Sequence, residues 1–174
     1  MHARDRDDVI EQVQRPRVLA FAAALQLDGK IVAAGTNTDA TGSKVTFAIA
    51  RYNANGTPDT TFDRTGRVSV DFGSFNQAAK RVLIQSDGKI VTVGFPDDEA
   101  SDSDFLLARL NANGSLDTSF GVGGKVRTSF GNLNGGANTA ILQTDGKIVA
   151  AGFQATSTQQ GVDIAMARYL DSVP

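Results

Sequence analysis

Carboxylates gather in one short loop of this sequence and are the first residues that could do chemistry. The acidic residues of this loop are Asp97, Asp98, Glu99, Asp102 and Asp104. Ca²⁺ prefers oxygen ligands, so the first four of them are candidate calcium ligands, although they do not have the spacing of an EF-hand. The simpler interpretation is a solvated acidic loop, in which Asp104 belongs to the fold because it aligns with Asp163 of a later repeat.

Acid–base catalysis in this chain would have to rely on such carboxylates. Cysteine is absent and His2 is the only histidine, which excludes thiol nucleophiles, disulfides and cysteine- or histidine-rich metal sites and disfavours a Ser-His-Asp triad. Aspartate and glutamate alone can supply the acid and the base of a glycosidase, provided that two of them converge with separated pKa values. The candidates for such a pair are Asp39, Asp97, Asp98 and Glu99.

Length and composition indicate a single soluble domain. The 174 residues are 41% hydrophobic and 21% charged, as in a globular chain. The formal net charge of -2 argues against nucleic acid and anionic lipid as partners. The apolar run 18–27 resembles the core of a signal peptide, but a long acidic stretch precedes it, and no run reaches the roughly 20 residues that span a membrane. The printed sequence thus predicts a cytoplasmic chain without a signal peptide.

The strongest signal in the sequence is an internal repeat. The segment Leu25-Gln-Leu-Asp-Gly-Lys-Ile-Val-Ala-Ala-Gly35 returns with few changes at residues 84–94 and 142–152. Its aspartates are 59 and 58 positions apart, at Asp28, Asp87 and Asp145. A period of this length is typical of proteins in which each repeat forms one supersecondary unit.

Two further signatures keep the same period. A run that ends in Ala-Arg occurs at residues 47–51, 105–109 and 164–168, and Asn-Ala-Asn-Gly follows the first two of these runs. Asn-x-Asn-Gly resembles half of a calcium loop, but Arg51 and Arg109 occupy the place of the first carboxylate ligand. We therefore interpret Asn-Ala-Asn-Gly as a turn.

Each unit is predicted to contain four short strands and no helix. The first strand ends at an Asp-Gly pair, which predicts a two-residue hairpin turn with positive φ at both residues, and the second strand is the Lys-Ile-Val run. The third strand ends in Ala-Arg and is apolar on both faces, as in a sheet buried between two neighbours. The fourth strand alternates, at residues 68–72 and 126–130.

A copy of the fourth strand also occurs near the N-terminus. A shift of 59 positions places Val9-x-Glu11-x-Val13 under Val68-x-Val70-x-Phe72. We interpret the chain as a charged tail at residues 1–7 and three units, at residues 8–66, 67–124 and 125–174. Each unit then begins with a fourth-type strand and continues with the first, second and third. The last sheet therefore has only three strands, and in a closed ring the N-terminal strand would complete it.

These motifs resemble the delta-60 repeat family of bacterial tandem-repeat proteins, which are built around LQxDGKIVxAG, FxLARxNxxG and LDTSFG. The resemblance covers residues 18–174. It implies an all-β protein, a β-propeller with four-stranded antiparallel blades, of which this chain has three. It also implies a secreted or cell-surface location, and it says little about chemistry.

Three blades are fewer than a closed propeller needs, because rings typically have four to eight. Two copies of the chain would supply six blades. We therefore predict a homodimer that forms one six-bladed ring, in which the N-terminal strand of each copy completes the last blade of the other. The alternative is a piece of a longer chain, which stays open or belongs to a larger ring.

Residues that recur in every unit are expected to serve the fold. Asp28, Asp87 and Asp145 are predicted to form turns. Arg51, Arg109 and Arg168 are predicted to donate hydrogen bonds between blades, to backbone carbonyls or to Asp59 and Asp117.

The loops that differ between units all emerge at one end of the blades and are the candidate binding surface. They span residues 36–46, 73–77, 95–104, 131–138 and 153–163 and are rich in polar residues. This composition suits a carbohydrate or a peptide, and the candidate binding residues are Asp39, Phe75, Phe95, Asp97, Asp98, Glu99, Asn132, Asn134 and Phe153. The predicted function is a binding or scaffold propeller, with calcium as its only candidate cofactor. A carboxylate-dependent hydrolase is the alternative, and the loops could also be plain solvated connections.

Overall fold

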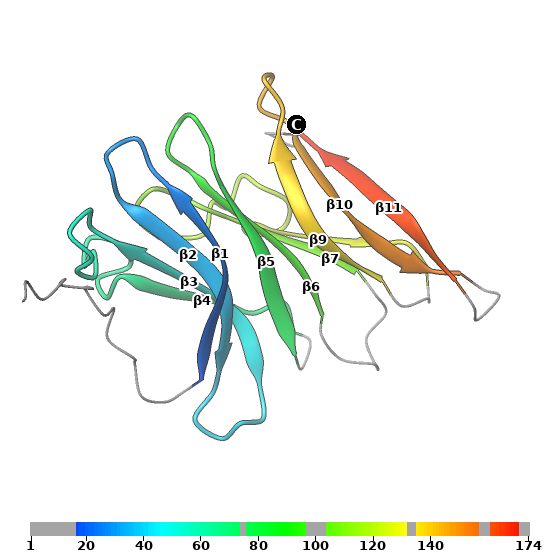
Figure 1. Cartoon of the computed structure of the whole chain (residues 1–174), viewed down its shortest axis with the longest axis horizontal. Helices are drawn as coiled ribbons and strands as arrows, with labels where there is room; N and C mark the ends of the chain where they lie inside the picture. The colour runs from blue at the N-terminus through cyan, green and yellow to red at the C-terminus, as the bar shows by residue number, and fades with distance from the viewer. Residues whose placement is uncertain (1–16, 74–75, 97–103, 132–134, 157–160, 171–174) are drawn as a thin grey trace, which may run out of the picture.

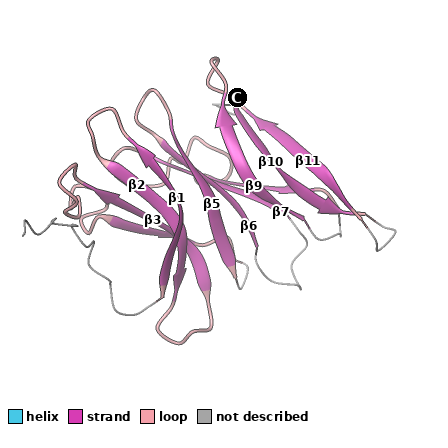
Figure 2. Ribbon diagram, in the orientation of Figure 1, coloured by secondary structure: helices cyan, strands magenta, loops and turns pink. Residues whose placement is uncertain are grey.

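The computed structural model of the chain describes residues 17–73, 76–96, 104–131, 135–156 and 161–170. All regular elements in these ranges are β-strands (Figure 2). They are β1 (Val18–Leu25), β2 (Ile31–Thr38), β3 (Val45–Tyr52), β4 (Arg67–Val70), β5 (Gln77–Ile84), β6 (Ile90–Pro96), β7 (Asp104–Leu110), β8 (Lys125–Ser129), β9 (Gly135–Leu142), β10 (Ile148–Ala155) and β11 (Val162–Tyr169). The all-β class expected from the sequence is confirmed.

The strands form three antiparallel sheets that follow one another along the chain (Figure 1). The strand orders are β1-β2-β3-β4, β5-β6-β7-β8 and β9-β10-β11. Each sheet is a meander in which consecutive strands pair, as in the blades of a β-propeller. We call the sheets the first, second and third blade, and the three together the arc.

Within the described ranges, the third blade ends at β11. In the first two blades the third strand pairs with a fourth, β3 with β4 and β7 with β8, whereas β11 pairs with β10 alone. This agrees with the expectation that the last blade has three strands. The segment Val9 to Val13, which is predicted to supply the missing strand of a ring, and the tail at residues 1–7 lie outside the described residues.

The turn between the first two strands of each blade is longer than the sequence predicts. In the first blade the amide of Gln26 donates to the carbonyl of Lys30 at 2.8 Å, and the amide of Gly29 donates to that of Gln26 at 3.0 Å. Gly29 has a φ of 82°, while Asp28 has no positive φ and accepts a hydrogen bond from the amide of Lys30 at 3.1 Å. Because this carboxylate holds the amide two residues ahead, the loop needs positive φ at its glycine alone. The predicted two-residue turn is wrong, and the predicted role of the aspartate in the turn is confirmed.

Adjacent blades bury an apolar face against each other. We call the side of a blade toward the following blade its rear face and the opposite side its front face. The rear face of the first blade and the front face of the second form one core, which includes Val32, Phe47 and Ile49 together with Val82, Ile90 and Leu106. The rear face of the second blade and the front face of the third form another, which includes Val91, Phe105 and Leu107 together with Ile148, Ala150 and Ala165. The third strand is therefore apolar on both faces, as expected.

The first strands of the blades converge on the inner edge of the arc. β1 packs against β5, and β5 packs against β9. Each of these strands has a bulge, whose extra residues are Phe21, Lys80 and Asn138. Opposite each bulge the second strand has a glycine, and a Cβ atom there would overlap a backbone carbonyl of the first strand. The glycine that closes the DGKIV segment is thus required by a close approach of two backbones.

We predict that Gly94→Ala destabilises the protein, because the new Cβ would overlap the carbonyl oxygen of Ala78 and no side-chain rotation can relieve that contact. The free energy of unfolding should fall by roughly 3 kcal/mol, measured by urea denaturation. Gly161→Ala is the matched control, because its new Cβ would meet only the side chain of Thr156, with the hydroxyl at 3.3 Å and the methyl at 4.0 Å. Equal stability of the two variants would contradict this account of the bulge.

Candidate functional site

A buried arginine–aspartate pair ties the third strand of a blade to the loop that follows it. Arg51 Nε donates to Asp59 Oδ2 at 2.7 Å, and Arg109 Nε donates to Asp117 Oδ2 at 2.8 Å. Each guanidinium also lies on an aromatic ring, with Cζ 4.7 Å from the centre of Phe62 and 4.6 Å from that of Phe120. The recurring Asp-Thr-x-Phe and Asp-Thr-Ser-Phe segments thus form the pocket that holds the arginine.

The same arginine also crosses to the next blade. Arg51 Nη1 donates to the backbone carbonyl of Ala112 at 2.5 Å, within the Asn-Ala-Asn-Gly turn of the second blade. Nearby, the amide of Asp63 donates to the carbonyl of Asn113 at 2.8 Å. The predicted role of Arg51 as a donor between blades is confirmed, and so is the interpretation of Asn-Ala-Asn-Gly as a turn.

Hydrogen bonds keep the two buried aspartates ionised. A hydrogen bond from the hydroxyl of Thr61 lowers the pKa of Asp59, and the nearby Arg51 lowers it further against the opposing effect of burial. Burial alone would raise the pKa of Asp117, but hydrogen bonds from Ser119 and the charge of Arg109 lower it. Both carboxylates have structural partners, so this network has the properties of a structural framework rather than of a catalytic pair.

Asp39 is the one predicted acid–base candidate in the described part of the loops. Its Oδ1 accepts hydrogen bonds from the hydroxyl of Thr41 and the amide of Ser43, both at 2.9 Å. The hydrogen bond from Thr41 lowers the pKa of Asp39, so this carboxylate is ionised and holds its own loop. The other predicted loop residues lie outside the described residues; they are Phe75, Asp97, Asp98, Glu99, Asp102, Asn132 and Asn134.

Two of the predicted binding residues, Phe95 and Phe153, lie against each other. Their ring centres are 6.0 Å apart with an edge-to-face angle of 82°, and Phe95 also covers Gly136 of the third blade. The amine of Lys80 lies 5.1 Å from the ring centre of Phe95 and 4.2 Å from that of Phe21. We call Phe21, Lys80, Phe95 and Phe153 the hub cluster.

The hub cluster lies at the inner edge of the arc, toward the end where the variable loops emerge. Phe21 and Lys80 are the bulge residues of β1 and β5, and Phe95 and Phe153 are near the ends of β6 and β10. The side chain of Phe21 is 47% exposed. The cluster therefore offers an accessible aromatic ring beside an amine, a combination that can bind the apolar face and the polar groups of a ligand together.

Sequence reasoning missed Phe21 and Lys80 because they occur inside a strand rather than in a loop. They share one position of the repeat with Asn138, but the next position, with Ala22, Arg81 and Thr139, also has three residue types. Divergence alone therefore does not identify them, and it takes the bulge and the packing of the blades to bring them together.

Comparison with protein families matches residues 26–62, 85–120 and 143–170 to a β-propeller domain of unknown function, DUF5122. The matched segments together cover more than half of the chain, and each begins at the Asp-Gly turn of one blade. The chain belongs to this family. The match confirms the expected β-propeller repeat, although its description does not include the name delta-60 repeat. No curated protein matches the sequence.

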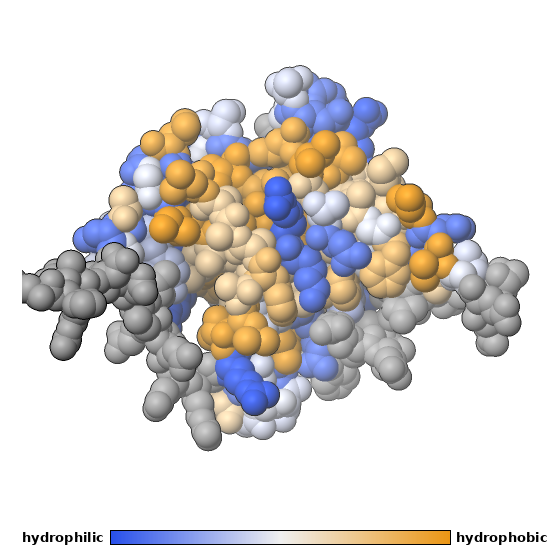
Figure 3. All heavy atoms as spheres, in the orientation of Figure 1, coloured by the Kyte–Doolittle hydropathy of each residue, from blue (hydrophilic) through white to orange (hydrophobic). Residues whose placement is uncertain are grey.

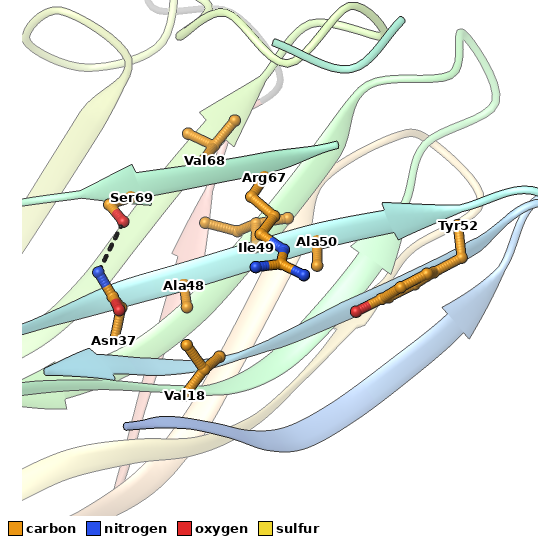
Figure 4. A pocket seen from close by; sticks show the side chains of 9 residues that line it. All are labelled: Val18, Asn37, Ala48, Ile49, Ala50, Tyr52, Arg67, Val68 and Ser69. Atoms are coloured by element: carbon orange, nitrogen blue, oxygen red, sulfur yellow. Dashed lines mark hydrogen bonds between the residues drawn. The ribbon is translucent and has the colours of Figure 1, made fainter. Parts of the chain in front are cut away.

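The front face of the first blade in this family member is uncovered and hollowed (Figure 4). The hollow has a volume of about 270 Å³ and is lined mainly by residues of β3 and β4, with Val18 and Asn37 at its side. Ala48, Ala50 and Tyr52 project into it, and Asn37 Nδ2 donates to the hydroxyl of Ser69 at 3.2 Å. The lining is mostly apolar and has no carboxylate, so it suits an apolar partner surface.

No helix in the described ranges is long and apolar enough to cross a membrane.

We predict that Arg51→Ala destabilises the protein, because the buried Asp59 loses the guanidinium that donates to it and keeps only Lys30, whose Nζ lies 4.0 Å from Oδ2, as a charged neighbour. The free energy of unfolding should fall by roughly 3 kcal/mol, the low end of the cost of breaking a buried ion pair. Arg81→Ala is the matched control, since Arg81 is exposed on β5 and makes no ion pair in the described structure. Chemical denaturation measures the free energy of unfolding of both variants. An equally small decrease in the two would contradict the structural role of Arg51.

Proposed function

We propose that this β-propeller is a binding module that presents the hub cluster and the surrounding variable loops to a polar ligand such as a carbohydrate or a peptide. The observation that carries the proposal is the placement of Lys80 between the rings of Phe21 and Phe95 at the variable end of the inner strands. Residues needed by the fold recur from blade to blade, whereas Phe21 and Lys80 stand at one repeat position where the residue type differs. Divergence at an accessible, aromatic site is typical of a surface that selects a ligand.

The amine of Lys80 has a specific part in this proposal. It makes no ion pair with a carboxylate of the described residues, and its charge faces two aromatic rings. Phe21 would stack on the apolar face of a sugar ring or on a peptide side chain, while Lys80 would donate hydrogen bonds to hydroxyl, carbonyl or carboxylate oxygens.

The binding proposal is tested with arrays of neutral and acidic oligosaccharides and of short peptides, followed by calorimetric titration of each probe that binds. Phe21→Ala and Lys80→Ala should each raise the dissociation constant at least about tenfold, because each removes a direct contact. Lys147→Ala is the control, since Lys147 lies at the opposite end of the blades, where it pairs with Asp145. Binding that is unchanged in the two hub variants, or lost equally in the control, would overturn the proposal.

We further propose that two copies of the chain assemble into one six-bladed ring. The third blade is one strand short of the other two in the described ranges, and residues 9–13 have the alternating pattern of the missing strand. In the ring, this segment of each copy pairs with β11 of the other copy and satisfies its free edge. The assembly brings two hub clusters around one axis.

Deletion of residues 1–17 tests this strand exchange. Light scattering coupled to size exclusion should give a mass near twice 18.3 kDa for the full chain and a weaker dimer for the truncated one. The truncated dimer should be weaker because the edge of β11 loses the strand that is proposed to pair with it. A full chain that is monomeric, or a dimer that is indifferent to the truncation, would contradict the exchange.

A further inference from the structure

Each end of the arc exposes a blade face of the kind that is buried between adjacent blades elsewhere in the arc. The front face of the first blade and the rear face of the third have no blade against them in the described structure. On β11, Ile164 is 85% exposed and Met166 is 66% exposed, whereas Phe105 and Leu107, at the same positions of the second blade, are fully buried. Figure 3 shows apolar side chains at this end of the molecule, where β10 and β11 lie. Both end faces are therefore built for contact with another blade.

The front face of the first blade has the same residue types as the front face of the third blade, which the second blade covers. Leu25, Ile31, Ala33, Ala48, Ala50 and Tyr52 correspond in the repeat to Leu142, Ile148, Ala150, Ala165, Ala167 and Tyr169, with the same residue type at each position. The second blade differs at most of them, with Thr92 in place of Ala33 and Leu106 in place of Ala48. The first blade thus has the front face of the third blade, whose partner is the rear face of the second.

The rear face of the third blade has large apolar side chains, as does the rear face that packs against such a front face within the arc. In the covered interface, the large Phe105 and Leu107 belong to the same core as the small Ala150 and Ala165. At the two open ends of the arc, Ile164 and Met166 are the large residues of the rear face, and the front face has a hollow at Ala48 and Ala50. Large side chains facing small ones are the condition for close packing between the two surfaces.

The structure assigns the front face of the first blade as the docking surface for the rear face of the third blade of a second copy. This inference rests on the proposed ring, and it names the surfaces that close it. The contact is head-to-tail and occurs twice, so a two-fold rotation closes the ring without leaving an apolar end exposed.

The arginine of the third blade joins the two copies in this arrangement. Arg51 donates to Ala112 of the following blade, and Arg168 occupies the same repeat position but is exposed in the arc. The residue that corresponds to Ala112 in the first blade is Ala54. Arg168 of one copy therefore donates to the backbone carbonyl of Ala54 of the other, and Arg168→Ala should weaken the dimer about tenfold without changing the stability of each arc.

Two single variants test the assignment, one on each face. Ile164→Asp places a charge on the rear face of the third blade, and Ala48→Asp places one on the front face of the first. Each should raise the dimer dissociation constant by roughly 100-fold, because a carboxylate would be buried in the contact; Arg67, which lines the hollow beside Ala48, offsets part of this cost for Ala48→Asp alone. Val122→Asp is the matched control, since Val122 is also 85% exposed but lies in the loop between β7 and β8. Circular dichroism establishes that each variant is folded.

Mixing the two variants distinguishes the head-to-tail contact from other dimers. Each variant alone should have the mass of one chain by light scattering. At concentrations well above the wild-type dissociation constant the mixture should recover the mass of two as an open dimer, because the intact rear face of Ala48→Asp meets the intact front face of Ile164→Asp, while the second contact carries both carboxylates and stays open. A dimer that survives either substitution, or a mixture that stays monomeric, would overturn the assignment while leaving the ring open to another interface. A wild-type chain with the mass of one copy would overturn the ring itself, and neither result bears on ligand binding at the hub cluster.

Discussion

Each blade of this protein has apolar side chains on both of its faces, and the rest of the structure depends on covering both. The second blade shows the satisfied case, with Leu106 buried toward the first blade and Leu107 buried toward the third. A sheet of this kind cannot face water on one side, as many antiparallel sheets do. The first and third blades each have one such face uncovered in the arc. This constraint is the physical reason to expect a partner of the same kind at both ends.

The buried arginine–aspartate pairs also stabilise the contact between blades. Arg51 binds Asp59 of its own blade and a backbone carbonyl of the next, so one side chain fixes a loop and a neighbour together. The aromatic ring of Phe62 beneath the guanidinium excludes water from the pair. The blades repeat these groups, whereas Phe21 and Lys80 at the inner edge, where we propose that a ligand binds, stand at a position where the repeats diverge.

The sequence predicted most of the fold because its signals are local and occur in several copies. The strand that ends in Arg51, the turn at Asn-Ala-Asn-Gly and the three-stranded last blade were all recognisable from the period. The type of turn at Asp28 was not, because a side-chain hydrogen bond to Lys30 selects a longer loop than the Asp-Gly pair alone indicates. The contact of Phe95 with Lys80 and Phe153 also escaped prediction, since it depends on a bulge and on the spacing between two blades.

Small-angle X-ray scattering of the full chain, recorded as it elutes from a size-exclusion column, tests the central claim that two arcs close into one ring. The account predicts a mass near twice 18.3 kDa from the forward scattering, and a distance distribution that fits a closed disc of six blades. The mass of one chain with the distribution of an open arc of three blades would contradict it. A mass that grows with concentration, as for a filament of arcs joined end to end, would contradict closure as well.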